Sequence, residues 1–299
     1  MAEESPIKYF DRYLAEVRHE QIYGEGWLRW VYGNPLGRMT LWAFFSRPFF
    51  SKWYGKRMSS SSSCSKIEPF VRDYELDTTE FAETVSSYTS FNDFFSRRLK
   101  PEARPIAGGE LAAFPADGRH LGFPDLSTLS QVFSKGQSLN FTRLFGSEET
   151  ASQFSDGTLV ISRLCPVDYH RFHFPVSGEA KPPSLIRGDL KSVNPIALRR
   201  NLAILWGNKR FLSFIESDSF GRVACIEIGA TCVGSVHYLS LAPTAVSKGD
   251  EKGWFSFGGS MTMTFFQKGK IQLADDLLAQ SASGLELYAR MGDQMGSPQ

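Results

Sequence analysis

The sequence predicts an α+β protein, in which a β-rich core of sandwich-like or barrel-like mixed sheets is preceded by N-terminal helices. The first observation is a change of texture near residue 109, after which short apolar runs alternate with Gly, Pro and Asp. The second is the segment 26–67, where aromatic and basic residues interleave without any acidic residue. The 299 residues, 42% apolar and 22% charged, can form a large core and exclude a mainly disordered chain.

Charge and cysteine content exclude several classes of protein. Basic and acidic residues nearly balance, 33 against 32, so composition gives no reason to expect a nucleic-acid partner. Four scattered cysteines without CxxC spacing predict neither a zinc site nor a disulfide framework. Four reduced thiols fit a cytoplasmic setting, and the opening MAEESPIKYFDRYLAE lacks the basic start and apolar stretch of a signal peptide.

The first predicted element is the helical segment 26–67, which carries seven basic and ten aromatic residues. No run in it approaches the ~20 apolar residues that a spanning helix needs. Rings at the acyl boundary and cations facing lipid phosphates suit a helix that lies on an anionic membrane surface. An aromatic helical hairpin packed on its own domain and a partner-binding helix are the alternatives. We favour the membrane surface and divide the chain into a membrane-associated helical segment, 1–68, and a second domain, 69–299.

The remaining helices and strands are predicted from helix-capping residues and from apolar runs. The serine run 59–63 predicts a flexible linker. The sequences 77–80 (DTTE) and 90–93 (SFND) each fit a helix start, and the second helix stops before Pro101. The tail 274–292 indicates a further weak helix. Strands are expected in GTLVISRL (157–164), LAILW (202–206), FLSFIES (211–217), RVACIEIGATCVGSV (222–236) and GWFSFGGSMTMTFF (253–266).

One segment contains a candidate carboxylate, and another contains a pair of histidines. Asp117 in PADG is either an ordinary turn residue or a carboxylate at a strand end that can orient a histidine. His170 and His173 lie three apart between prolines, where extended chain is expected. They would then point to opposite faces and do separate jobs instead of sharing one metal ion. The alternative is that both are ordinary surface or buried histidines.

The third segment is Gly258-Gly259-Ser260, which lies between predicted strands. It fits a glycine-rich turn or bulge. The chemical alternative is an N→O acyl shift, in which Ser260 Oγ attacks the carbonyl of Gly259. Two glycines permit the strained backbone that this reaction needs, together with a base and a donor to the oxyanion.

In chain order, these segments closely resemble the phosphatidylserine decarboxylase proenzymes, which are pyruvoyl-dependent decarboxylases. The resemblance runs from about Thr89 to Phe266, and Met261 departs from the threonine that many members carry there. The motifs are FNDFFSRRLKPEARPI, PADG, FSKGQSLN with RLFG, CPVDYHRFHFPVSG, SVNPIAL, FGRVACIEIGATCVGSV and KGDEKGWFSFGGS.

The resemblance implies that Asp117, His173 and Ser260 form a self-processing triad. His173 would take the Ser260 proton, and Asp117 would fix the tautomer of His173. Cleavage between Gly259 and Ser260 would give a β chain (1–259) and an α chain (260–299) that stay associated. Ser260 would become a pyruvoyl group, the covalent cofactor that forms a Schiff base with the substrate amine. His170 is the candidate acid that returns a proton to the substrate, and no metal is implied.

The implied reaction converts phosphatidylserine to phosphatidylethanolamine in phospholipid biosynthesis. The enzyme would then sit peripherally on the cytoplasmic side of the cell membrane, with the anionic surface as a partner, and a homodimer is compatible with this. Three alternatives remain. They are a pyruvoyl decarboxylase of soluble amino acids, a serine hydrolase that uses the same three residues without cleavage, and a non-catalytic lipid-binding β module.

Overall fold

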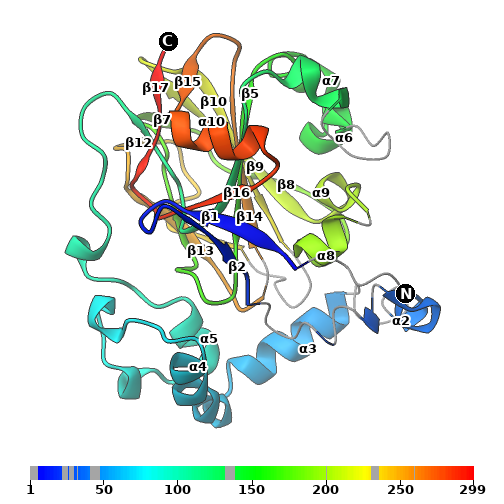
Figure 1. Ribbon diagram of the computed structural model, residues 1–299, viewed down its shortest axis with the longest axis vertical. Coiled ribbons are helices and arrows are strands. Elements are labelled where there is room, and N and C mark those ends of the chain that lie inside the picture. Colours follow the sequence, from blue (N-terminus) through cyan, green and yellow to red (C-terminus); the bar gives the residue numbers. More distant parts are fainter. Residues whose placement is uncertain are drawn as a thin grey trace.

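A computed structural model describes residues 6–21, 26, 30–31, 33–40, 48–131, 139–199, 201–229, 236–258 and 260–299. As the sequence predicts, it is an α+β structure, with one eleven-stranded sheet and two three-stranded sheets (Figure 1). In the large sheet the strand order is β12-β7-β9-β10-β14-β5-β4-β16-β1-β2, and β8 also pairs with β9. Every pairing is antiparallel except that of β1 with β16, which is parallel.

The strand bounds are as follows. The large sheet contains β1 (Lys8–Asp11), β2 (Glu16–His19), β4 (Gly118–Phe123), β5 (Thr158–Leu164), β7 (Gly178–Ala180), β8 (Ser184–Ile186), β9 (Arg210–Ser217), β10 (Gly221–Ile228), β12 (Thr244–Val246), β14 (Ser260–Phe266) and β16 (Glu286–Ala289). One small sheet contains β11 (Val236–Tyr238), β13 (Glu251–Phe255) and β6 (Arg171–His173). The other contains β15 (Ile271–Leu273), β17 (Gln294–Pro298) and β3 (Ala112–Ala113).

Short helices surround the sheets, and α10 crosses in front of the large sheet in Figure 1 while α3, α4 and α5 lie together at its lower end. The α-helices are α2 (Pro35–Thr40), α3 (Pro48–Met58), α4 (Ile67–Asp73), α5 (Phe91–Phe95), α6 (Phe141–Phe145), α7 (Glu148–Ser152), α8 (Pro195–Leu198), α9 (Ile204–Gly207) and α10 (Asp275–Ala282). The 3₁₀ helices are η2 (Ser61–Lys66), η3 (Thr78–Glu80), η4 (Val85–Ser87), η5 (Pro101–Ala103) and η6 (Leu126–Gln131).

Strand β14 is central to the large sheet and is buried along its whole length. Side chains alternate across a strand, so Met261, Met263 and Phe265 enter one apolar cluster. Ser260 and Thr262 therefore point to the opposite face. The departure at Met261 thus lies in the core, away from the face that carries Ser260.

Several sequence expectations are confirmed. The runs 157–164 and 211–217 form β5 and β9. Ser90 caps α5 by accepting from the backbone N–H of Asp93. Asp77 caps η3 in the same way, with Thr79 as donor.

Two local expectations are wrong. The run 202–206 does not form a strand, because residues 204–207 form α9 and pack Ile204 and Leu205 into the core. The serine run 59–63 is not a flexible linker: it leads into η2, and buried Ser63 hydrogen-bonds the carbonyl of Met58 and the N–H of Phe91. An apolar run of four or five residues fits either helix or strand, and burial decides between them.

Part of the predicted N-terminal segment is not helical. Within the segment 1–68, β1 and β2 pair with each other, and β1 also pairs with β16 of the large sheet. Helix α3 does follow, and part of the segment 26–67 lies outside the described residues. Within the described ranges, none of the helices has both the length and the apolar content needed to cross a bilayer.

Candidate active site

Ser260 begins β14 and lies opposite Leu164 of β5. Its side chain is fully buried, and its Oγ has no hydrogen-bond partner among the described residues. A buried hydroxyl without a partner costs free energy, so such an atom indicates a functional role. The preceding residue, Gly259, lies outside the described residues.

Strand pairing brings the histidine segment alongside the chain that leads to Ser260. Strand β6 pairs with β13, which places His173 opposite Glu251. The N–H of Phe255 donates to the carbonyl of His170 at 2.9 Å. The segment 164–173 therefore contacts both ends of the stretch 255–260.

One ring nitrogen of His173 is hydrogen-bonded, and the other has no hydrogen-bond partner among the described residues. Its Nδ1 lies 3.0 Å from the carbonyl oxygen of Gly249, which can only accept, so Nδ1 carries the proton and Nε2 does not. The buried Nε2 has no partner. Burial also lowers the pKa of His173, which keeps the ring neutral. His173 thus offers an unprotonated nitrogen that can accept a proton.

The carbonyl of Gly249 is held in place by a tight turn. The N–H of Ser247 donates to Asp250 Oδ2 at 2.7 Å, and the N–H of Asp250 donates back to the Ser247 carbonyl at 3.0 Å. Gly249 has φ +86°, and a Cβ there would lie 2.7 Å from Ile106. Only glycine adopts this conformation without strain, so the turn depends on it.

His170, which immediately precedes β6, repeats this pattern. Its Nδ1 donates to the carbonyl of Asp168 at 3.0 Å, and its Nε2 is buried without a partner. The ring of Phe95 covers it at a centroid distance of 3.8 Å. Burial lowers the pKa of His170 to about 3. The two histidines thus have separate surroundings, and their separate roles remain a prediction.

Asp117 is buried, and its carboxylate is held by other groups. Arg104 Nη2 donates to Oδ2 at 2.6 Å, and the N–H of Met291 donates to Oδ1 at 2.8 Å. The structure brings Asp117 close to His173, because the N–H of His173 donates to the carbonyl of Pro115. The expected bond from Asp117 to His173 Nδ1 is not the one found, since Gly249 occupies that nitrogen.

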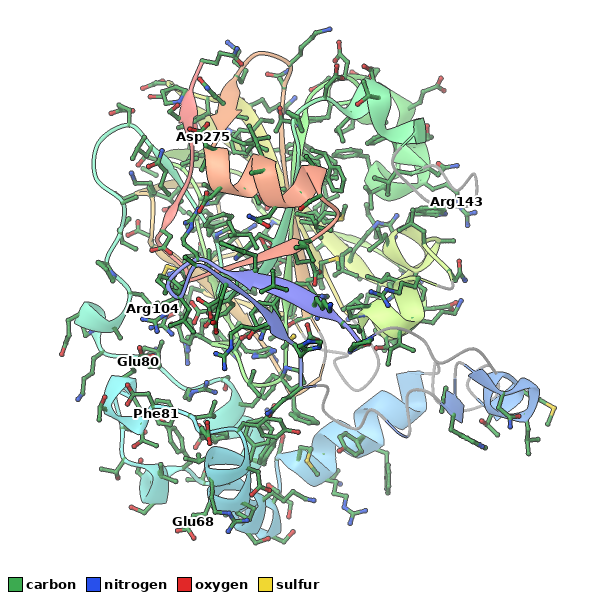
Figure 2. All side chains as sticks on the ribbon, in the orientation of Figure 1. Glu68, Glu80, Phe81, Arg104, Arg143 and Asp275 are labelled. Carbon is green, nitrogen blue, oxygen red and sulfur yellow. The ribbon has the colours of Figure 1, made fainter. Side chains whose placement is uncertain are left out.

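The sequence analysis missed three residues that bond the site residues: Arg104, Gly249 and Met291. Arg104 also donates to Glu80 at 2.9 Å, and Figure 2 labels both residues at the boundary between the helical end and the sheets. Arg104 lies in the motif KPEARPI and Gly249 in KGDEKG, so both were visible as motif residues without a role. Gly118 lets this region close, because a Cβ there would lie 2.5 Å from the Arg163 carbonyl.

Among the described residues, no group of three His, Cys, Asp or Glu side chains could hold a metal ion. The candidate groups for chemistry are the serine, the two histidines and the carboxylate. A buried hydroxyl and a neutral imidazole on neighbouring segments are the parts of a nucleophile and its base.

Comparison with known proteins gives a consistent result. The phosphatidylserine decarboxylase family model matches residues 91–297. A phosphatidylserine decarboxylase proenzyme from Fusobacterium nucleatum is 39% identical over 292 residues, covering 97% of both chains. One from Clostridium botulinum is 39% identical over 292 residues, covering 97% of this chain and 99% of the relative. One from Chlamydia muridarum is 40% identical over 295 residues, covering 98% of both chains.

Proposed function

The chain belongs to the phosphatidylserine decarboxylase family, and we propose that it is a precursor that cuts its own backbone between Gly259 and Ser260. The cut enzyme then decarboxylates phosphatidylserine to phosphatidylethanolamine. The observation that carries the proposal is the buried, unpartnered hydroxyl of Ser260 on a strand that adjoins the segment of His173.

Self-cleavage begins with transfer of the Ser260 hydroxyl proton to His173 Nε2 as Oγ bonds to the Gly259 carbonyl carbon. The amide C–N bond breaks, and its nitrogen takes up the proton, which leaves an ester. Loss of the α-proton of residue 260 then expels the Gly259 carboxylate and leaves dehydroalanine. Tautomerisation and attack by water release ammonia and leave a pyruvoyl group on residue 260.

The surroundings of Ser260 fit this modification, because its oxygen has no hydrogen bond to lose when the side chain is converted. The keto group would supply an electron sink for the electron pair that remains when carbon dioxide leaves the substrate. His170 is proposed to deliver a proton to the substrate. Because its pKa is about 3 in the precursor, Nε2 must first take up that proton.

Asp117 remains proposed as the third member of the triad. Its negative charge raises the pKa of neighbouring His173, opposing the larger effect of burial. Charge on His173 during proton transfer is therefore stabilised without a direct hydrogen bond. Arg104 fixes the direction of the carboxylate.

We further propose that the enzyme acts peripherally on the cytoplasmic side of the cell membrane. Large apolar side chains are exposed in the described part of the segment 26–67: Trp30, Leu36, Met39 and Trp53. Lys56 and Arg57 are exposed beside Trp53. Aromatic rings next to cations suit the interface of an anionic membrane, where a diacyl substrate resides.

The proposal is tested by intact-mass analysis of the expressed protein. We expect two fragments, 1–259 and a pyruvoyl-bearing 260–299, that elute together from a sizing column until denaturant is added. Ser260→Ala and His173→Ala remain uncut, and His170→Ala is cut but releases little carbon dioxide from phosphatidylserine.

The matched control is Ser256→Ala, which removes a nearby hydroxyl that bonds His237 and leaves cleavage unchanged. An active, full-length wild-type chain would refute the proposal. Labelling of that chain by a fluorophosphonate would point to a serine hydrolase. Carbon dioxide from free amino acids but not from the lipid would point to a soluble substrate.

A further inference from the structure

Arg97, the second residue after α5, is a buried cation that forms no ion pair with the residues that the structure describes. Its side chain is 5% exposed, and its guanidinium lies 4.9 Å from the ring centroid of Phe81 and 5.1 Å from that of Phe94. Nη2 donates to the carbonyl oxygens of Val167 at 3.2 Å and Asp168 at 3.3 Å. The remaining donors, Nε and Nη1, have no partner within the part of the chain that the structure describes.

The other buried arginines near the site are neutralised. Arg104 pairs with Asp117, Arg119 with Asp168, and Arg163 with carboxylates that include Glu286. Within the described residues, Arg97 has no such ion pair. Burial lowers its pKa to about 10, an effect that the negative charges of Asp117 and Asp168 offset only in part. A buried charge normally has a partner, so the unsatisfied guanidinium of Arg97 is suited to an anion that is not part of the protein.

Arg210 shows what a purely structural buried arginine looks like in this fold. It also lacks a carboxylate among the described residues, but its guanidinium donates to four carbonyl oxygens. These belong to Leu144, Trp206, Asn208 and Arg143. Arg210 thus has every nitrogen bonded, whereas two of the three guanidinium nitrogens of Arg97 are free.

Tyr88 supplies another free donor in the same neighbourhood. Its ring lies 5.6 Å from that of Phe94, the ring against which Arg97 packs. The hydroxyl of Tyr88 is buried and has no partner. A guanidinium with a phenolic hydroxyl makes a donor set suited to an oxyanion.

This donor set adjoins the candidate active site. The Asp168 carbonyl oxygen accepts from both His170 Nδ1 and Arg97 Nη2, so one atom bridges the two side chains. The free atoms of Arg97 are shielded from solvent, as are Ser260 Oγ and His170 Nε2. A substrate that reaches residue 260 must therefore enter the buried region that also contains the free atoms of Arg97.

We propose that Arg97 and Tyr88 bind the phosphodiester group of the lipid headgroup. This rests on the proposed function, which supplies a substrate with two anionic groups, a carboxylate and a phosphodiester. The carboxylate leaves as neutral carbon dioxide, so a cation bound to it would stabilise the ground state and slow the reaction. The phosphodiester keeps its charge throughout, and binding it holds the headgroup without opposing the chemistry.

The test uses the cleaved wild-type enzyme and the variants Arg97→Lys and Tyr88→Phe, with fragment masses checked first. We expect the KM for phosphatidylserine to rise about 10–100-fold in Arg97→Lys and less in Tyr88→Phe, with kcat changed less than threefold. Tyr88→Phe removes a hydroxyl that makes no internal bond, so its melting temperature should not fall. Arg210→Lys is the control, with a lower melting temperature and an unchanged KM.

Calorimetric titration measures the binding of each anionic group without any catalytic turnover. Glycerophosphoethanolamine, which has a phosphodiester and no carboxylate, should bind wild-type enzyme and lose its affinity in Arg97→Lys. Loss of L-serine binding instead would assign Arg97 to the carboxylate and overturn the proposal. An unchanged KM with unchanged glycerophosphoethanolamine binding would also overturn it. Because titration needs no turnover, this result is distinct from failure of wild-type cleavage, which would defeat the proposed function.

Discussion

At the residue scale, a backbone carbonyl sets the proton-accepting nitrogen of His173. Gly249 holds Nδ1–H, so Nε2 is the free base. The acceptor depends on the turn that Asp250 closes over Ser247. Loosening this turn should therefore disturb His173 even though no side chain that contacts the imidazole is changed.

We expect Asp250→Ala to slow self-cleavage about tenfold, because the Gly249 carbonyl is no longer held at Nδ1. Asp250→Asn retains an oxygen for the Ser247 N–H and should cleave at nearly the wild-type rate. Imidazole ¹⁵N spectra of the uncut Ser260→Ala chain report the tautomer directly. In that background, Asp250→Ala should give mixed tautomers, whereas Asp117→Asn should leave Nδ1 protonated. The reverse pattern would mean that Asp117, and not the Gly249 carbonyl, fixes the tautomer of His173.

His120 is buried for a structural reason. Its Nδ1 accepts from Ser162 Oγ at 2.9 Å, and its Nε2 donates to the Ala289 carbonyl at 3.1 Å. Burial lowers its pKa to about 3. Between pH 6.5 and 3 the unfolded chain therefore binds a proton that the folded chain does not. The free energy of unfolding must fall as pH falls through this window.

Removing this histidine should flatten the pH dependence of stability. We expect His120→Gln, in the uncut Ser260→Ala chain, to reduce the slope by about 1.4 kcal/mol per pH unit below pH 6. Urea denaturation between pH 7 and 4.5 measures it. Ser162→Ala is the control, because it lowers stability but keeps the titrating ring and hence the slope. An unchanged slope in His120→Gln would contradict the assignment.

The sequence names candidate residues for the site, but it does not reveal their contacts. Asp117, His170, His173 and Ser260 could be named because their motifs have a recognisable order. The bond from Gly249 comes from backbone 76 residues further along, which no local pattern reveals. Arg97 was visible in FNDFFSRRL, but only burial shows that two of its nitrogens lack partners.

At the element scale, β14 joins the site to the core. Its neighbours on the Ser260 face include Thr262, which lies opposite Glu227 of β10. Glu227 is buried and bonds Lys252 of β13 at 2.5 Å and Tyr238 of β11 at 2.7 Å. This ion pair therefore ties the β11-β13-β6 sheet, which carries His173, to the sheet that carries Ser260.

Breaking that pair from one side should be costly. We expect Lys252→Met to destabilise the uncut chain by about 3–5 kcal/mol, because it leaves the Glu227 carboxylate buried without its cation. The double variant Glu227→Gln/Lys252→Met should recover most of the loss, because no unpaired charge remains. Urea denaturation of the four proteins in the cycle measures the coupling. Additive losses would mean that the two groups do not interact.

Long, strongly patterned strands were the predictable elements. The runs 157–164 and 211–217 carry enough Val, Ile, Leu and Phe to specify buried strands on their own. The run 202–206 is too short to do so, and its neighbours favour helix. The strand β16 within a tail expected to be helical is likewise decided by its partners β4 and β1.

At the scale of the whole molecule, the proposed membrane-facing end and the β14–β15 turn lie at opposite ends in Figure 1. We expect Lys56→Glu/Arg57→Glu to weaken binding to phosphatidylserine-containing vesicles about 10–100-fold, since each cation near an anionic surface contributes about 1 kcal/mol. Co-sedimentation at low salt measures it. Lys268→Glu/Lys270→Glu makes the same change of charge on the exposed distant turn and should bind normally. Equal loss in both would indicate a general charge effect.

The overall class was predictable from texture, but the place of residues 8–19 was not. KYFD and EVRH are short and polar, and they become strands because β16 offers its edge to β1. Arg12 then forms two bonds to Asp276, at 2.6 and 2.7 Å, and Tyr13 bonds Asp293. Such pairings between distant segments are decided by the assembled sheet.

That parallel pairing of β1 with β16 has a consequence for the timing of maturation. Strand β14 lies between β10 and β5, and β16 fills the gap between β4 and β1, so the sheet is complete only when residues 286–289 are in place. A ribosome that has just added Ser260 holds a chain that contains the nucleophile but lacks β16. That strand joins residues 8–19 to the rest of the large sheet. The first strands of the chain can therefore join the large sheet only after residues 286–289 have been made and have left the ribosome, later than Ser260 itself.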